Sequence, residues 1–599
     1  MKRGQLTLEF LMLILAVVIG GAIIATQIGG INFNSKDVEN IKKLTIVSFT
    51  PSNTTLNVNF NLSATTTHIN NTTNNTTTNN NTNNNETDTN INIPGRIDDL
   101  FLHVKGYALL TKNYISGGNW VSGEINKKIN NKEIVKYNAN GTVGGNITIN
   151  KGGELLFGNI YEISSLYLKM DDHNAGETYI NVPKVDKISA DTLEGRLLNI
   201  SSSYIGNFEV TGKEGIKTKK LLFINSYIDD FYAYSIEKSY GTYINIELYK
   251  TEIDNIKVDK DIKCNMEVIN SKIEGNIEAR DIYGNYEFIN SSVGNIKTNR
   301  YIKGDIKLVN SKINNIEAKK GINNKFMIFN NSDIENIKTD GNIKSENMKI
   351  INSKINNIET GGSFKGLVEF SNSLVENIKI KNNINAKMTF KNTNVSGNIE
   401  ANNIYNNFKF IDSTVENIKI KHNIKYNMDI INSKINNIEA GTIYANVYIH
   451  NSIIDTISAN TMKNNKIVID SSSISSLKMG SYSYKMGLIK NTTIKEIIID
   501  NTYKCNKYNY LTIDNSSVDK IYINKYNNNG LINNSIVKEI TINEYKSKNN
   551  NKLFIKNSRI DKISVNKWGK HSQIEIIESY IEGKYYKHAI MDNSGIHNI

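Results

Sequence analysis

Paired carboxylates are the side chains of this chain that come closest to an acid–base catalytic arrangement. Asp171 is followed directly by Asp172, and Asp229 by Asp230. Two carboxyl groups held close together can act as general acid and general base, as they do in glycoside hydrolysis. Exposed turns also contain adjacent aspartates, and we favour that interpretation for both pairs.

The other reactive residue types do not form a recognisable motif. The histidines, for instance His422 and His450, lack the two-histidine spacing of a metalloprotease helix. The cysteines Cys264 and Cys505 lack zinc-ligand spacing. The glycine-rich segment 144–153 lacks both phosphate-binding fingerprints. The sequence therefore predicts no catalytic residues, no metal and no cofactor, and we expect that the protein is not an enzyme.

Tyrosines gather in the last part of the chain and raise a different possibility. Aromatic side chains on a flat surface could contact carbohydrate or protein. We favour ordinary packing and filling of corners as the role of these six residues: Tyr503, Tyr508, Tyr510, Tyr522, Tyr526 and Tyr545.

One sequence pattern returns about every 20 residues from Leu198 to the C-terminus, in about 18 copies. Within each copy, isoleucine, valine and alanine recur with period two in short bursts, which is typical of strands. A repeat of two or three short strands fits one coil of a parallel β-helix, whose stacked coils bury a continuous core. The sequence therefore predicts an all-β fold: a single-stranded parallel β-helix, right-handed, with about 20 residues per coil.

Each copy contains an Asn-Ser step that we place at a corner of the coil. Asparagine tolerates left-handed backbone angles, and stacked identical amides can hydrogen-bond from coil to coil. We expect such an asparagine ladder at Asn270, Asn290, Asn310, Asn352, Asn372, Asn432 and Asn451. No proline follows Pro183, which agrees with a ladder that needs a backbone donor at nearly every position. Twelve or so coils separate Cys264 from Cys505, a distance of nearly 60 Å that excludes a disulfide.

The first 28 residues indicate a membrane location. The apolar run from residue 6 to 28 is long enough to cross a bilayer as an α-helix. Lys2 and Arg3 precede it, so the positive-inside rule places the N-terminus in the cytoplasm and the bulk of the chain outside the cell. Glu9 lies inside the apolar run, where a charge is costly. It either reaches the headgroups or pairs with a positive group on a neighbouring copy.

The segment KRGQLTLEF, residues 2–10, resembles the class III signal peptide of archaeal type IV pilin-like proteins. The resemblance covers residues 1–30 and implies that a prepilin peptidase cleaves between Gly4 and Gln5. It also implies that Glu9 pairs with the N-terminal amine of the next pilin-like subunit during filament assembly. Short segments such as residues 275–279 resemble bactofilin-type polymer-forming β-helices.

Between the membrane segment and the repeats, composition predicts a stalk and a linker. Residues 29–63 contain alternating apolar residues and a Pro51 turn, so we expect a short β-rich stalk. Residues 64–95 are dominated by asparagine and threonine and cannot bury enough apolar surface to order, so we expect a disordered linker. N-glycosylation acceptor sequences, which also arise by chance in such a composition, occur at Asn53, Asn61, Asn70, Asn71, Asn74, Asn75, Asn80 and Asn85.

The resulting plan has six parts. These are a leader at 1–4, a transmembrane pilin-like helix at 5–28, the stalk, the linker, an irregular β region with the N-terminal cap at 96–197, and β-solenoid repeats at 198–599. The net charge of +12 comes mostly from scattered lysines, which indicates a solvated face and no nucleic-acid partner.

The function that we expect is that of a single-pass, membrane-anchored, pilin-like cell-surface protein. Its extracellular β-helix would be a rod with a structural or adhesive role, contacting surface carbohydrate or protein. Two alternatives remain open at this stage: an extracellular carbohydrate-active β-helix enzyme, and a structural polymer of solenoids stacked end to end.

Overall fold

The computed structural model describes the chain in segments from Ile115 onward. These are residues 115–120, 123–129, 134–139, 142–149, 154–157, 162–171, 177–239, 241–463, 466–483, 486–502, 510–527, 529–545, 552–569, 572–582, 589–592 and 595–597. Within these segments, no helix combines the length and the apolar character needed to cross a membrane. The predicted membrane helix at 5–28 lies outside them and stays a prediction.

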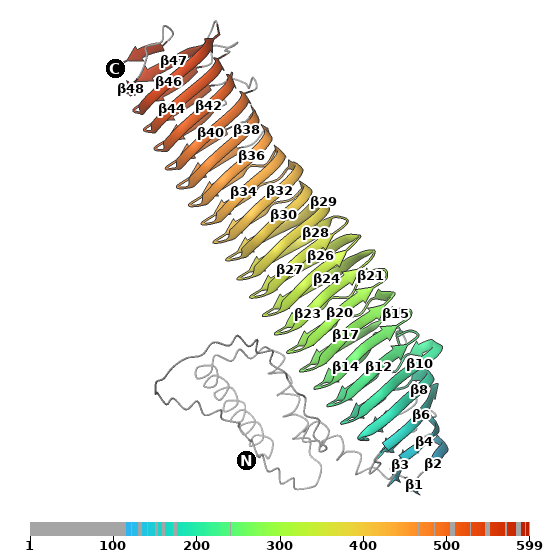
Figure 1. Ribbon diagram of the computed structural model, residues 1–599. Coiled ribbons are helices and arrows are strands. Elements are labelled where there is room, and N and C mark those ends of the chain that lie inside the picture. Colours follow the sequence, from blue (N-terminus) through green and yellow to red (C-terminus); the bar gives the residue numbers. More distant parts are fainter. Residues whose placement is uncertain are drawn as a thin grey trace, which may run out of the picture. The chain divides into compact units, whose positions relative to one another are not determined.

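Parallel pairing between successive turns organises every strand. For example, β32 (Thr414–Ile424) pairs in parallel with β30 (Asn394–Ile404) of the turn before and with β34 (Lys434–Ile443) of the turn after. The turns therefore stack in sequence order, as Figure 1 shows. The predicted all-β parallel solenoid is confirmed, with about 19 turns marked by 19 corner residues of positive φ.

Parallel pairing is already present before the regular repeats. Nine strands precede residue 204: β1 (Ile115–Trp120), β2 (Gly123–Ile129), β3 (Ile134–Ala139), β4 (Thr142–Ile149), β5 (Glu154–Phe157), β6 (Glu162–Asp171), β7 (Glu177–Ile180), β8 (Lys184–Glu194) and β9 (Leu197–Ser201). Pro183 stands directly before β8, where its carbonyl accepts the Tyr204 N–H at 3.0 Å. A proline is tolerated there because it precedes the first residue of the strand.

The first regular turns contain two or three strands each. They are β10 (Tyr204–Ile216), β11 (Lys220–Ile224), β12 (Tyr227–Ala233), β13 (Ile244–Tyr249), β14 (Glu252–Val258), β15 (Asp261–Ile262), β16 (Cys264–Ile269), β17 (Lys272–Ala279), β18 (Asp281–Ile282), β19 (Tyr286–Ile289), β20 (Ser292–Thr298), β21 (Tyr301–Ile302), β22 (Ile306–Val309) and β23 (Lys312–Ala318).

Further along, the strands join across bends and become longer. They are β24 (Gly321–Asn330), β25 (Asp333–Thr339), β26 (Asn342–Ile351), β27 (Lys354–Thr360), β28 (Phe364–Ser371), β29 (Leu374–Lys391), β30, β31 (Phe408–Ile411), β32, β33 (Met428–Ile431), β34, β35 (Val447–His450), β36 (Ile453–Lys463), β37 (Lys466–Asp470), β38 (Ser473–Ser483), β39 (Met486–Lys490), β40 (Thr493–Thr502), β41 (Tyr510–Asp514), β42 (Ser517–Tyr526), β43 (Asn529–Asn533), β44 (Ile536–Tyr545), β45 (Lys552–Lys556), β46 (Arg559–Trp568), β47 (Gln573–Ile577), β48 (Tyr580–Glu582), β49 (Ala589–Asp592) and β50 (Gly595–His597).

One turn buries its inward residues in four pairs. In the turn that begins at Ser433, the buried pairs are Ser433 with Ile435, Ile438 with Ala440, Ile443 with Ala445, and Val447 with Ile449. Two outward residues follow the first, second and fourth pairs, so the alternation changes phase and the chain must bend there. The chain also bends at Ala445, between the end of β34 at Ile443 and the start of β35 at Val447. Each turn therefore has four sides, with the interior filled by side chains.

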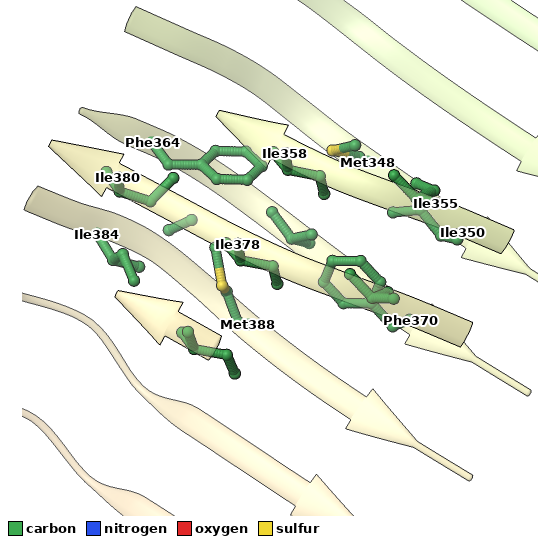
Figure 2. Close-up of a cluster of buried hydrophobic side chains, with 14 of the residues drawn as sticks. Met348, Ile350, Ile355, Ile358, Phe364, Phe370, Ile378, Ile380, Ile384 and Met388 are labelled. Atoms are coloured by element: carbon green, nitrogen blue, oxygen red, sulfur yellow. The ribbon is translucent and has the colours of Figure 1, made fainter. Parts of the chain in front are cut away.

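Equivalent residues of successive turns lie above one another in the core. Figure 2 shows this arrangement for Ile358 and Ile378. Met348 and Met388 lie two turns apart in one such column, since both are register partners of Val368. Aromatic residues stack in the same way, with ring centroids of Phe370 and Phe390 4.7 Å apart. Burying one isoleucine contributes about 1.5–3 kcal/mol, and every turn buries several, so the core stabilises the stack continuously.

Candidate functional site

A buried column of hydroxyl groups runs along the main corner of the solenoid. The residue after each positive-φ corner is serine or threonine, and each is at most 7% exposed. We call this column the serine ladder: Ser203, Ser226, Thr251, Ser271, Ser291, Ser311, Ser332, Ser353, Ser373, Thr393, Ser413, Ser433, Ser452, Ser472, Thr492, Ser516, Ser535, Ser558 and Ser579.

The serine ladder satisfies backbone groups that the corner would otherwise leave unpaired. The N–H of Ser332 donates to Oγ of Ser353 in the next turn at 3.1 Å. That hydroxyl donates in turn to the carbonyl of Ile351, two residues earlier, at 2.7 Å. Because a buried N–H without an acceptor is costly, one small hydroxyl at this position is the chemical requirement of the corner.

The residue directly before the serine has left-handed backbone angles and points outward. All seven asparagines of the predicted ladder occupy this position, with φ between 47° and 51° and exposed side chains. Their amides hydrogen-bond between turns: Nδ2 of Asn290 donates to Oδ1 of Asn270 at 3.1 Å, and Asn310 donates to Asn290 at 3.1 Å. Similar bonds join Asn372 to Asn352 and Asn451 to Asn432.

A second asparagine ladder lies at the next bend, five residues after the corner in most turns and six at Asn276 and Asn398. It runs through nine turns: Asn276, Asn295, Asn315, Asn336, Asn357, Asn377, Asn398, Asn417 and Asn437. Seven of its links are amide–amide bonds of 2.6–3.1 Å, and at Asn398 the backbone N–H donates instead. Our sequence reasoning missed this ladder, although the asparagine five residues after the corner was a visible signal.

Asp229 and Asp230 lie within β12, so the exposed turn that we favoured for this pair is wrong, and they do not form a pair of free carboxylates either. The hydroxyl of Tyr204 donates to Oδ2 of Asp229 at 2.5 Å, while Tyr227 donates in the same way to Asp254 at 2.7 Å. The hydrogen bond to Asp229 raises the pKa of Tyr204. These tyrosine–aspartate bonds join neighbouring turns on the surface. Asp172 lies outside the described residues, so the exposed turn that we favoured for Asp171 and Asp172 stays a prediction.

The described residues contain no group of three or more acidic, histidine or cysteine side chains that could hold a metal ion. His450 lies 3.6 Å from Asp470 on an exposed surface. Cys264 is fully buried and free, and burial raises the pKa of its thiol. A buried neutral thiol behaves as a small apolar side chain, so Cys264 packs in the core.

Two of the six clustered tyrosines belong to the core and cannot form an exposed aromatic surface. Tyr526 is 3% and Tyr545 is 0% exposed, and they stack edge to face with ring centroids 5.0 Å apart. The hydroxyl of Tyr545 donates to the Gln573 carbonyl at 3.0 Å. The interpretation as packing residues therefore fits these two. Tyr503 and Tyr508 lie outside the described residues.

Buried charges occur at one place in the described chain. Arg280 donates from Nε and Nη2 to both carboxylate oxygens of Asp261, at 2.8 and 2.9 Å. One turn later, Asp281 is completely buried and accepts the Tyr301 N–H at 2.9 Å, with Arg300 Nη1 3.4 Å from Oδ2. Charged hydrogen bonds of this kind fix the bend between neighbouring turns.

A shallow groove of about 970 Å³ follows the side of the solenoid that comes after the second asparagine ladder. Its floor contains Ile380, Ala401, Ile420 and Ala440, one from each successive turn. Its outward side chains carry charge, and lysine alternates with glutamate from turn to turn. This regular alternation over neighbouring turns has a period of two turns, about 40 residues.

The alternation extends beyond the groove over ten successive turns. We call this set the Lys/Glu column: Lys257, Glu278, Lys297, Glu317, Lys338, Glu359, Lys379, Glu400, Lys419 and Glu439. Each member is the register partner of the next, from β14 to β34. Tyr232 precedes the column and Ser458 follows it. Like charges are therefore never neighbours within it.

Several predicted residues lie outside the described part of the chain and stay predictions. They are the processing residues Gly4 and Gln5, the assembly residue Glu9, and the acceptor asparagines Asn53, Asn61, Asn70, Asn71, Asn74, Asn75, Asn80 and Asn85.

No protein-family model, curated protein or solved structure matches this chain. The class that the fold defines is a parallel β-solenoid, and anything narrower must come from the residues themselves.

Proposed function

We propose that this chain is a membrane-anchored, pilin-like cell-surface protein whose extracellular β-solenoid has a structural or adhesive role. The observation that carries the proposal is the combination of a long apolar segment with a basic leader and a solenoid of about 19 turns. Because each turn contacts only its neighbours, a solenoid stabilised by repeating side-chain ladders can be extended turn by turn, which suits a structural element that reaches away from the membrane.

The polar chemistry of the described surface supports a structural role. The exposed asparagines bond to asparagines of adjacent turns, and the surface tyrosine Tyr204 bonds to Asp229. These groups use their hydrogen-bonding capacity to stabilise the stacked turns. They leave the Lys/Glu column and the groove as the surface most suited to contact a partner.

The N-terminal part of the proposal makes a covalent prediction. A prepilin peptidase acting between Gly4 and Gln5 would leave Gln5 as the first residue of the mature chain. Mass spectrometry of the protein purified from its membrane tests this directly. A mature chain that still begins at Met1 would contradict the pilin-like assignment.

Filament entry is tested separately from anchoring. Glu9→Ala should leave the chain in the membrane fraction but prevent its recovery in sheared filaments, because the amine of a neighbouring subunit loses its partner. Glu39→Ala, which removes a glutamate outside the apolar run, is the matched control. Normal filament recovery of Glu9→Ala would exclude assembly through this residue. Electron microscopy with a label at the C-terminus then locates the solenoid on the cell.

A further inference from the structure

The Lys/Glu column is a ten-position surface whose members form no ion pairs with one another. Glu278 accepts a hydrogen bond from Nδ2 of Asn276 at 3.2 Å. The column lies wholly in the described segment 241–463, and there no ion pair within 4 Å joins two of its members. Elsewhere on the same solenoid, such pairs do form between turns: Lys307 Nζ lies 2.9 Å from Glu287 Oε1. The five lysines of the column are exposed.

Alternation alone has a simple explanation within the chain, since it keeps like charges from stacking. That explanation accounts for the alternation of lysine and glutamate. It does not account for the absence of ion pairs between adjacent, oppositely charged members of the column. It also does not account for the groove, which places these charges above an apolar floor that includes Ile380 and Ile420. A partner surface accounts for all three observations.

An alternating column is complementary to itself when two copies run antiparallel. If the first member of one column faces the last member of the other, Lys257 meets Glu439, Lys297 meets Glu400, and Lys338 meets Glu359 at the centre. Every remaining position then also faces its opposite charge. A parallel arrangement in register would place like charges face to face at all ten positions.

We propose that the Lys/Glu column is a homotypic interface through which two copies of this chain associate antiparallel. The two-fold axis lies between Lys338 and Glu359, so the same surface serves both copies, as in an isologous dimer. Exposed ion pairs are individually weak, and association therefore depends on the whole column acting together and falls with added salt.

Zero-length cross-linking with a carbodiimide tests the geometry on the full chain in detergent. The reagent adds to a glutamate carboxylate, and the lysine amine then attacks the activated carbonyl carbon, forming an amide and releasing the reagent as a urea. Because no spacer is inserted, only groups already in contact are joined. In a mixture of isotopically light and heavy chains, a mixed Lys257–Glu439 product is the expected result. Nine turns, about 43 Å, separate these two residues within one chain, so the link cannot form internally.

Charge reversal tests the energetics by sedimentation. Lys338→Glu and Glu359→Lys should each weaken dimerisation at least about tenfold, because each makes two contacts repulsive. The double variant carrying both changes should restore affinity to within a few fold, since the two exchanged charges at the centre again face opposite charges across the interface. It retains as many like-charge neighbours within its own chain as either single variant, so lost folding cannot explain the difference.

Control variants with the same change in net charge lie on other sides of the solenoid. Lys365→Glu and Glu369→Lys in β28 should leave dimerisation unchanged. A dissociation constant insensitive to Lys338→Glu, or a double variant no tighter than the single ones, would overturn the proposal. Mixed cross-links confined to residues one turn apart, such as Lys338 with Glu317, would indicate a staggered parallel pair and overturn it too.

Discussion

Removing one hydroxyl from the serine ladder should open the solenoid locally. Ser353 is 5% exposed, accepts the N–H of Ser332 and donates to the Ile351 carbonyl. In Ser353→Ala, the Ile351 carbonyl still accepts the Asn331 N–H at 3.0 Å, so it is not left unpaired. The N–H of Ser332 loses its acceptor, and one buried unsatisfied donor costs about 1–3 kcal/mol.

Hydrogen exchange at the Ser332 amide measures this cost at the site itself. A loss of about 1–3 kcal/mol in local opening free energy corresponds to exchange about 5- to 150-fold faster. The effect should decline within a few turns, because each turn is stabilised mainly by its direct neighbours. Amides of distant turns therefore serve as an internal reference.

Ser353→Thr is the matched control, since the chain itself uses threonine at this position. Thr492 accepts the Ser472 N–H at 3.4 Å and donates to the Lys490 carbonyl at 2.7 Å. Threonine at 353 should therefore retain protection of the Ser332 amide. Equal protection in the alanine and threonine variants would refute the assignment of the hydroxyl as the required acceptor.

Three further substitutions test other parts of the same corner-and-bend chemistry. Asn352→Ala should cost about 1–2 kcal/mol in urea unfolding because alanine resists the left-handed angles, and Asn352→Gly should cost less; equal losses would contradict this. Arg280→Met should destabilise by about 1.5–3 kcal/mol because the buried Asp261 carboxylate loses two charged hydrogen bonds and keeps only Lys263 Nζ, 3.9 Å away. The double variant with Asp261→Asn should recover part of that loss, and a purely additive cycle would argue against coupling. The hydrogen bond to Asp259 raises the pKa of Tyr232 to about 12. The stabilising effect of this hydrogen bond should therefore be complete below about pH 10 and fade as the pH rises towards about 12. Tyr232→Phe should flatten that part of the curve of stability against pH, and an unchanged curve would show that Tyr232 is not the group responsible.

The isoleucine period and the missing prolines predicted the solenoid because both follow from the local demands of a stacked strand. The serine ladder was harder to foresee. In the sequence, Ser353 looks like the second residue of an Asn-Ser turn, and its role depends on an N–H one turn away. Contacts between residues about 20 positions apart are therefore visible only when the register is known.

The buried tyrosines show a second limit of sequence reasoning. Tyr526 occupies an inward position, and a Cβ on Gly530 would lie 2.4 Å from its hydroxyl oxygen. A glycine on the neighbouring strand thus makes room for a side chain that would otherwise not fit inside the coil. The same relation joins Tyr482 to Gly487. Such pairs could be recognised only by looking for tyrosine and glycine four or five residues apart.

The two-turn period of the Lys/Glu column limits how the length of this molecule can change. Duplication or loss of one coil inside the column would leave the hydrogen-bonded core intact but would set two lysines or two glutamates side by side. Gain or loss of two coils together preserves both the core and the sequence of signs. Rods of this kind should therefore grow and shrink in steps of about 40 residues, and a matching partner must change by the same step.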